Sequence, residues 1–210
     1  MAVLVPVKGS PGEFYAPHLG KTIQIVEWRE DDKYDTVVYA SGAMTAGLTK
    51  HFFRDLDNKE AQDTNFTTPR RLPAGEEMIL DRVGLYVPLF FGDTTVRDDD
   101  VLKVIENGHF KVKINKSDVG EGPFVKFPSG YGISGQTTAT DRGIVSIGVP
   151  SSAAASKLIR EQYLTKDHDI SATAQHNDRT WDTTNMPTLG GKVQLKCFLH
   201  GLIKSAATKG

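Results

Sequence analysis

Cysteine is nearly absent from the chain: Cys197 is the single one among 210 residues, so no disulfide can form within a subunit. Chains that fold without disulfides are typical of reducing compartments, and we expect this one to be made in the cytoplasm. Long apolar runs are absent too, because no segment approaches the roughly 20 residues that a membrane-spanning helix needs. The apolar N-terminus lacks a charged region and is interrupted by Pro6, so we expect neither a signal peptide nor a transmembrane segment.

An excess of charge of either sign is also missing. The chain has 25 Lys and Arg against 26 Asp and Glu, which gives a net charge of −1. Binding to nucleic acid without sequence preference requires a concentrated basic field, so we expect no strong nucleic-acid binding. The densest basic group is Arg70 and Arg71, with Lys50, His51 and Arg54 upstream, and it lacks the interleaved aromatic residues of a single-strand groove. We interpret it as solvated surface charge.

Motifs for catalysis and cofactor binding are scarce. The six histidines show neither the HxH nor the HExxH spacing of metal sites, and Asp98–Asp100 lacks the alternating oxygen ligands of a calcium loop. The segment GYGISG at 130–135 matches a dinucleotide fingerprint by letter, but Pro128 precedes it where the motif requires a buried strand. We therefore predict no catalytic residue, no cofactor and no metal ion, and a glycine-rich surface loop at 130–135.

What the chain does contain is strand-forming sequence, most clearly within Thr64–Phe91. Its turn-rich beginning leads into a run whose apolar residues alternate on one face: Ile79, Val83, Leu85, Val87 and Leu89. The opposite face is half apolar as well: Met78, Leu80, Tyr86 and Phe90. A strand that is apolar on both faces belongs in the middle of a covered sheet.

Similar runs recur along the chain. We predict strands at Thr22–Trp28, Asp35–Ala40, Met78–Val87, His109–Asn115, Ile144–Val149, Asp169–Gln175 and Lys192–Lys204, with a weaker one at Pro123–Phe127. Three residues of one strand (Phe110, Val112 and Ile114) and three of another (Ile170, Ala172 and Ala174) alternate with polar residues, which predicts one common core. The last run places Cys197 on its inward face as a small apolar residue and has a mixed outer face. This pattern predicts an all-β, two-sheet sandwich.

Two short helices are expected in the connections between strands. Asp98–Asn107 begins with acidic residues and is followed by Gly108, and Ser151–Leu164 begins with serines after Pro150. The segment 1–20 has three prolines and no sustained period, so we predict an extended arm that lies on the surface or on a neighbour. Residues 21–210 are then one β-sandwich domain.

The layout resembles a coat protein of the single jelly-roll type, as found in tailless icosahedral bacterial viruses. The segments that carry the resemblance are the arm at 1–20, FFRDLDNK at 52–59, TNFTTPRRLPAGEEMILDRVGLYVP at 64–88 and GIVSIGVPSSAAASKLI at 144–159. The resemblance implies a jelly-roll fold and a structural virion protein that self-assembles into a shell without catalysis. It also implies copies of itself and other virion proteins as partners, and residence in the virion after synthesis in the host cytoplasm.

Two other functions stay open. A receptor- or carbohydrate-binding β-sandwich would present an aromatic platform, for which the candidates are Trp28, Trp181, Tyr131 and Tyr34. A β-fold hydrolase would use an acid/base pair, either His168 with Asp169 or His176 with Asp178. Either pair could act only if folding brought a nucleophile near it, and the sequence does not show such an arrangement.

Overall fold

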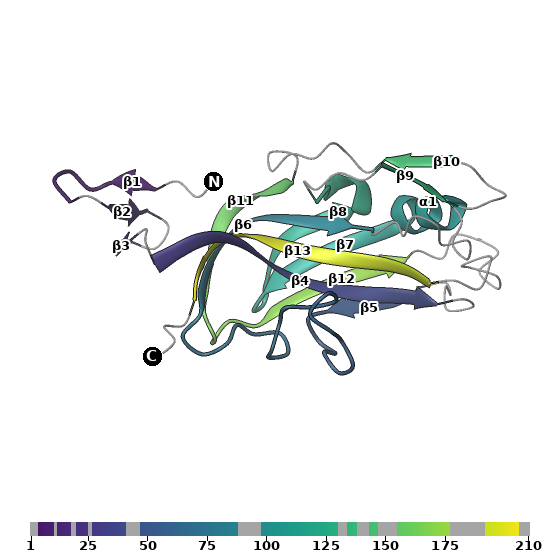
Figure 1. The fold of residues 1–210 in the computed structure, drawn as a ribbon, viewed down its shortest axis with the longest axis horizontal. Coiled ribbons are helices and arrows are strands. Elements are labelled where there is room, and N and C mark those ends of the chain that lie inside the picture. Colours follow the sequence, from purple (N-terminus) through teal and green to yellow (C-terminus); the bar gives the residue numbers. More distant parts are fainter. Residues whose placement is uncertain are drawn as a thin grey trace.

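Two four-stranded antiparallel sheets form the body of the molecule (Figure 1). A computed structural model describes residues 4–10, 12–17, 20–24, 27–40, 47–87, 98–129, 134–137, 143–146, 155–176 and 192–205. The first sheet has the order β11-β6-β13-β4 and the second has the order β5-β12-β7-β8. Their bounds are Trp28–Ala40 (β4), Thr49–Phe52 (β5), Glu77–Tyr86 (β6), Gly108–Ile114 (β7), Ser117–Pro123 (β8), Ser156–Leu164 (β11), Ile170–His176 (β12) and Lys192–Lys204 (β13). The predicted all-β sandwich is confirmed.

These eight strands pair in a nested order. In chain order the first pairs with the last, the second with the seventh, the third with the sixth and the fourth with the fifth: β4 with β13, β5 with β12, β6 with β11, and β7 with β8. All four pairs are antiparallel. The pairs are therefore nested along the chain, with β4 and β13 as the outermost pair and β7 and β8 as the innermost.

The core lies between the two sheets, as the alternating patterns predict. Phe110, Val112 and Ala172 are fully buried, and Val112 lies opposite Ala172 in the ladder between β7 and β12. On β13, Cys197 is also fully buried, and this burial raises the pKa of its thiol. The inward faces predicted for β7, β12 and β13 are thus confirmed.

The central strand β6 differs from the prediction in its register. Its ladder with β13 shifts between His200 and Gly201, so that Asp81 is an extra residue on β6. Such a bulge reverses the alternation. Met78 and Leu80 consequently share the core with Val83, Leu85 and Val87, whereas Ile79 faces outward into a second, smaller cluster. The prediction that β6 is central and buried on both sides is confirmed, since it lies between β11 and β13.

Of the two predicted helices, one forms. Helix α1 spans Asp98–Glu106 and buries Val101 and Val104 at one end of the sandwich. The helix predicted at Ser151–Leu164 is wrong over Ser156–Leu164, which is the edge strand β11, and residues 151–154 lie outside the described residues. Pairing with β6 and burial of Leu164 in the core outweigh the helical propensity of the segment.

Several predicted strand limits also change. The strand at Pro123–Phe127 is wrong: β8 ends at Pro123, and Phe124–Lys126 is a 3₁₀ turn. Phe124 and Phe127, three residues apart, both point into the core, which fits three residues per turn. The run predicted at Thr22–Trp28 is divided between β3 (Lys21–Gln24) and the start of β4. Within Ile144–Val149, strand β10 covers Gly143–Ser146 and pairs with β9 (Ser134–Thr137); the remainder lies outside the described residues.

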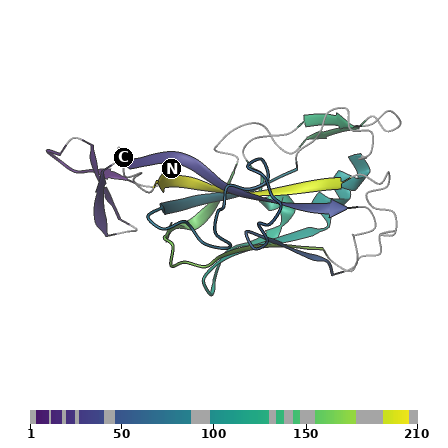
Figure 2. The same ribbon diagram turned by 60° about the horizontal axis from the view of Figure 1, so that its bottom comes forward.

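Strands of the N-terminal segment form a small sheet together with the strand that follows it. Strands β1 (Val5–Pro6), β2 (Glu13–Ala16) and β3 pair in that order, and all are antiparallel. In both ribbon views this sheet projects beyond one end of the sandwich (Figures 1 and 2). We call it the N-terminal sheet.

Candidate functional site

The N-terminal sheet has two different faces. Phe14, Ala16 and Ile23 share one face and pack against the sandwich, where Ala16 is fully buried. On the opposite face Val5 pairs with Tyr15, and these two side chains are 47% and 42% exposed. Val5 and Tyr15 thus form an exposed apolar patch, and such patches mark contact surfaces when they are extended by neighbouring apolar groups. The outward face is therefore a candidate contact surface.

The surface on which the N-terminal sheet rests belongs to the outer side of the first sheet. Its members are Trp28 from β4, Ile79 from β6, Tyr163 from β11 and Leu202 from β13. Ile79 is fully buried although it points away from the main core. We call these four residues the seat, because they hold the N-terminal sheet by apolar contact.

Polar groups form a rim around the seat. The ammonium of Lys204 lies 2.5 Å from a carboxylate oxygen of Glu27. The Tyr163 hydroxyl donates a hydrogen bond to the Glu77 carboxylate. Burial and this carboxylate raise the pKa of Tyr163 to about 12, so the hydroxyl keeps its proton and remains a donor at neutral pH.

Farther along the same outer face, aromatic rings gather around Phe198. The ring centroids of Tyr34 and Tyr86 lie 5.7 and 6.1 Å from that of Phe198, and the His200 ring stacks on it at 5.7 Å. The Lys196 ammonium lies 4.9 Å from the centre of the Tyr34 ring. These rings are half-buried, and the mixed outer face predicted for the last strand is thus an aromatic cluster.

The structure separates the members of the predicted aromatic platform. Trp28 belongs to the seat and is buried, whereas Tyr34 belongs to the cluster around Phe198. Tyr131 and Trp181 lie outside the described residues. The sequence did not indicate Tyr86 or Phe198, because only the register β4-β13-β6 brings them beside Tyr34.

The edge of the first sheet at β4 is closed by the loop 53–66. The amide of Asn65 takes the place of a neighbouring strand: its oxygen accepts from the Tyr34 N–H at 2.8 Å, and its nitrogen donates to the Asp32 carbonyl at 2.7 Å. The loop is also held by the buried Asp35 carboxylate of β4, which accepts hydrogen bonds from Lys59 at 2.8 Å and from the Phe53 N–H at 2.6 Å. The two bonds of Asn65 occupy backbone groups of β4 that another chain would otherwise pair with.

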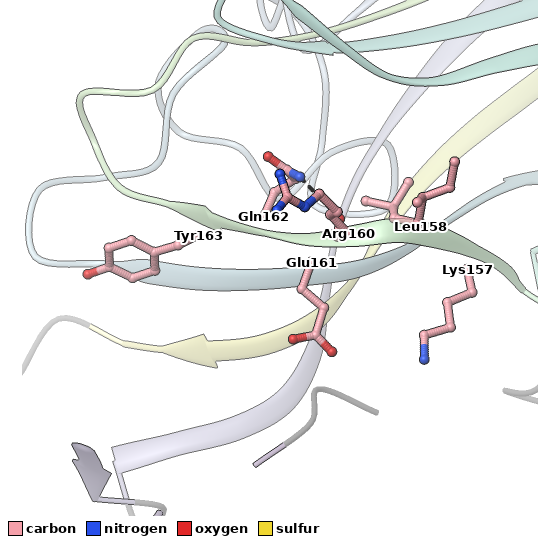
Figure 3. A pocket seen from close by; sticks show the side chains of 7 residues that line it. Lys157, Leu158, Arg160, Glu161, Gln162 and Tyr163 are labelled. Carbon is pink, nitrogen blue, oxygen red and sulfur yellow. Dashed lines mark hydrogen bonds between the residues drawn. The ribbon is translucent and has the colours of Figure 1, made fainter. Parts of the chain in front are cut away.

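The opposite edge of this sheet, β11, is shaped differently. Its ladder with β6 is broken between Lys157 and Gln162, so that residues 158–161 have only Asp81 opposite them. Figure 3 shows the residues that line the resulting open hollow of about 550 Å³, all of them from 157–163. Ile159, at the middle of this segment, is completely exposed.

The two histidines considered for catalysis have structural surroundings. The Thr165 N–H donates to His168 Nδ1 at 3.1 Å within a turn, and the neighbouring Asp169 carboxylate binds Arg70 at 2.5 Å. His168 and Asp169 are thus each engaged with other partners. His176 is buried, and its Nε2 lies 2.9 Å from the Tyr39 hydroxyl. Its proposed partner Asp178 lies outside the described residues.

Burial determines the protonation of the pair between His176 and Tyr39. It lowers the pKa of His176 to about 4 and raises the pKa of Tyr39 well above its ordinary value. At neutral pH the ring is therefore uncharged, and its Nε2 can accept the hydroxyl proton of Tyr39. Because Tyr39 lies on β4 and His176 on β12, this hydrogen bond joins the two sheets.

Two residues of the basic group noted in the sequence, Arg70 and Lys50, have different partners. Arg70 is paired with Asp169, and the Lys50 ammonium lies 5.8 Å from the centre of the Tyr39 ring. On the outer face of the second sheet, Lys111 binds Asp118 at 2.9 Å and Glu121 at 3.0 Å. The charges of Arg70 and Lys111 are thus each balanced by carboxylates.

Within the part of the chain that the structure describes, no three His, Cys, Asp or Glu side chains are grouped as metal ligands would be. In the same part, no helix has the length and hydropathy to cross a membrane. No family model matches the chain, and neither curated proteins nor solved structures give a match.

Proposed function

We propose that the chain is a capsid subunit, a structural virion protein that self-assembles into an icosahedral shell and catalyses no reaction. The observation that carries this proposal is the N-terminal sheet, which binds the sandwich by one face and presents Val5 and Tyr15 on the other. Burial of this face by a neighbouring subunit would stabilise the contact, and repetition of one contact by symmetry builds a shell. The partners are then copies of the chain and other virion proteins.

We further propose that the sandwich is a jelly roll. The nested pairing of its eight strands supports this, because a rolled antiparallel ribbon has that order. Sandwiches of this type occur in viral capsids but also in lectins and cupins, so the fold supports the capsid proposal without distinguishing it from binding proteins.

Assembly can be tested with a double substitution on the outward face, Val5→Ser with Tyr15→Ser. Light scattering and negative-stain microscopy at high protein concentration should show particles for the unchanged chain and their loss in the variant. The melting temperature should change little, because both side chains are exposed. Val125→Ser, at a residue that is 64% exposed on the 3₁₀ turn, is the matched control and should assemble normally. A strictly monomeric unchanged chain across salt and pH would contradict the proposal.

A carbohydrate-binding module is the second candidate, and the aromatic cluster on the outer face favours it. Tyr34 is half-buried there, with Lys196 above its ring and Phe198 beside it. Aromatic side chains that keep one exposed surface are suited to contact sugar rings. A glycan array with Tyr34→Ala as control separates the candidates: binding that depends on Tyr34 would favour the module.

A further inference from the structure

The two edge strands of the first sheet, β4 and β11, differ in how their outer backbone groups are paired. At β4, the Asn65 amide occupies the Tyr34 N–H and the Asp32 carbonyl, two groups that a new strand would need. At β11, no strand among the described residues pairs with the outer edge, and Ile159 is completely exposed at its middle. This edge is bulged and carries Lys157, Arg160 and Glu161, so a strand that adds here must match these charges.

The side chains around Ile159 have a pattern that suits a second copy of the same strand. Lys157 and Glu161 lie two residues before and two residues after Ile159, and both point to the same side of β11 (Figure 3). In an antiparallel pair with a two-fold axis at Ile159, Lys157 lies opposite Glu161 of the partner subunit. Symmetry gives the contact two such pairs of opposite charge. The same axis places Ile159 opposite its own copy.

We propose that two copies of the chain pair antiparallel along β11 about a two-fold axis at Ile159. Each contact then consists of a central Ile159 pair flanked by two pairs of opposite charge. The four strands of each first sheet join into one continuous sheet, whose outer edges are the capped β4 strands. This deepens the assembly proposal by naming one contact between subunits, in addition to the one made by the N-terminal sheet.

Cysteine cross-linking tests the axis directly. Residues directly opposite each other in an antiparallel pair have Cα atoms about 4.5–5.5 Å apart, which is within the range of a disulfide. Ile159→Cys should therefore form a disulfide-linked dimer under mild oxidation. The native Cys197 is fully buried and does not compete. Val125→Cys, also at an exposed apolar residue, is the matched control and should remain monomeric on a non-reducing gel.

Exchange of the two charges tests the register. Lys157→Glu alone places like charges opposite each other at both flanking positions, and it should weaken the dimer roughly tenfold in dissociation constant. Glu161→Lys alone should do the same, and the double variant Lys157→Glu with Glu161→Lys should restore the affinity. Analytical ultracentrifugation measures all four proteins, and circular dichroism confirms that each is folded.

The outcomes separate this contact from the capsid proposal. If Ile159→Cys cross-links no faster than Val125→Cys, or the double charge variant is not restored, the pairing along β11 is wrong, and the bulge then protects this edge. Shells that still form would leave the capsid proposal standing. Dimers that cross-link and respond to charge without any larger particle would support the contact and contradict the shell.

Discussion

At the scale of single residues, the buried pair of His176 and Tyr39 makes stability depend on pH. Burial lowers the pKa of His176 from 6.5 to about 4. At a pH between these two values, His176 therefore binds a proton in the unfolded chain but not in the folded chain. Stability is therefore lost as pH falls from 6.5 towards 4, by at most roughly 3 kcal/mol for this residue. His176→Gln keeps a partner for the Tyr39 hydroxyl and does not titrate.

Urea unfolding at pH 7 and pH 4.5 measures this effect. The loss of unfolding free energy on acidification should be smaller in His176→Gln than in the unchanged protein. His51→Gln, at an exposed histidine on β5, is the control and should lose as much as the unchanged protein. Equal losses in all three proteins would show that His176 is already protonated, or accessible to protons, in the folded state.

Residue-level predictions succeeded where a strand is regular and failed where it is bulged. The inward faces of β7, β12 and β13 followed from alternation, and the structure buries those residues. On β6 the extra residue Asp81 shifted the face of everything before it, so Ile79 moved from the expected core face to the seat. A bulge depends on how two strands pair, and no local pattern in the sequence marks it.

At the scale of elements, β11 shows what propensity alone could not settle. The segment Ser151–Leu164 favours a helix, with alanines at 153–155 before Leu158 and Ile159, yet Ser156–Leu164 pairs with β6 as an edge strand. The burial of Leu158 and Leu164 in the common core decides the outcome. The aromatic cluster around Phe198 was likewise invisible in the sequence, because its rings come from three strands far apart in the chain.

The loop 53–66 acts as an element that closes the β4 edge, and Asn65 is its central contact. Asn65→Ala removes two hydrogen bonds to partly buried backbone groups, at Tyr34 and Asp32. We expect a loss of about 2 kcal/mol in unfolding free energy and faster aggregation through the opened edge. Gln62→Ala, at an exposed side chain in the same loop, should change stability by less than about 0.5 kcal/mol. Urea unfolding measures both, and equal effects would contradict the role of Asn65.

At the scale of the whole molecule, two bodies are joined through the seat. None of the described residues of the segment 1–16 belongs to the main core, whereas the smaller cluster contains Ala16 and is flanked by Leu4 and Phe14. Strand order and this contact between parts are long-range properties, which explains why the sequence predicted a sandwich and an N-terminal arm but not how they meet. The division into residues 1–20 and 21–210 stays a prediction, and the N-terminal sheet includes β3 from beyond that limit.

Removal of residues 1–16 should leave the sandwich folded but uncover Ile79. We expect a loss of about 1–2 kcal/mol in unfolding free energy, because an isoleucine side chain returns to water. Ile79→Thr should lower the stability of the full chain by a similar amount, yet change the truncated chain little, since its side chain is then already exposed. Urea unfolding of the four proteins forms a double-mutant cycle, in which a coupling of at least about 0.5 kcal/mol is expected for residues in contact. Additive losses would mean that the N-terminal sheet does not rest on this seat in solution, and its apolar inner face would then need a neighbouring subunit to cover it.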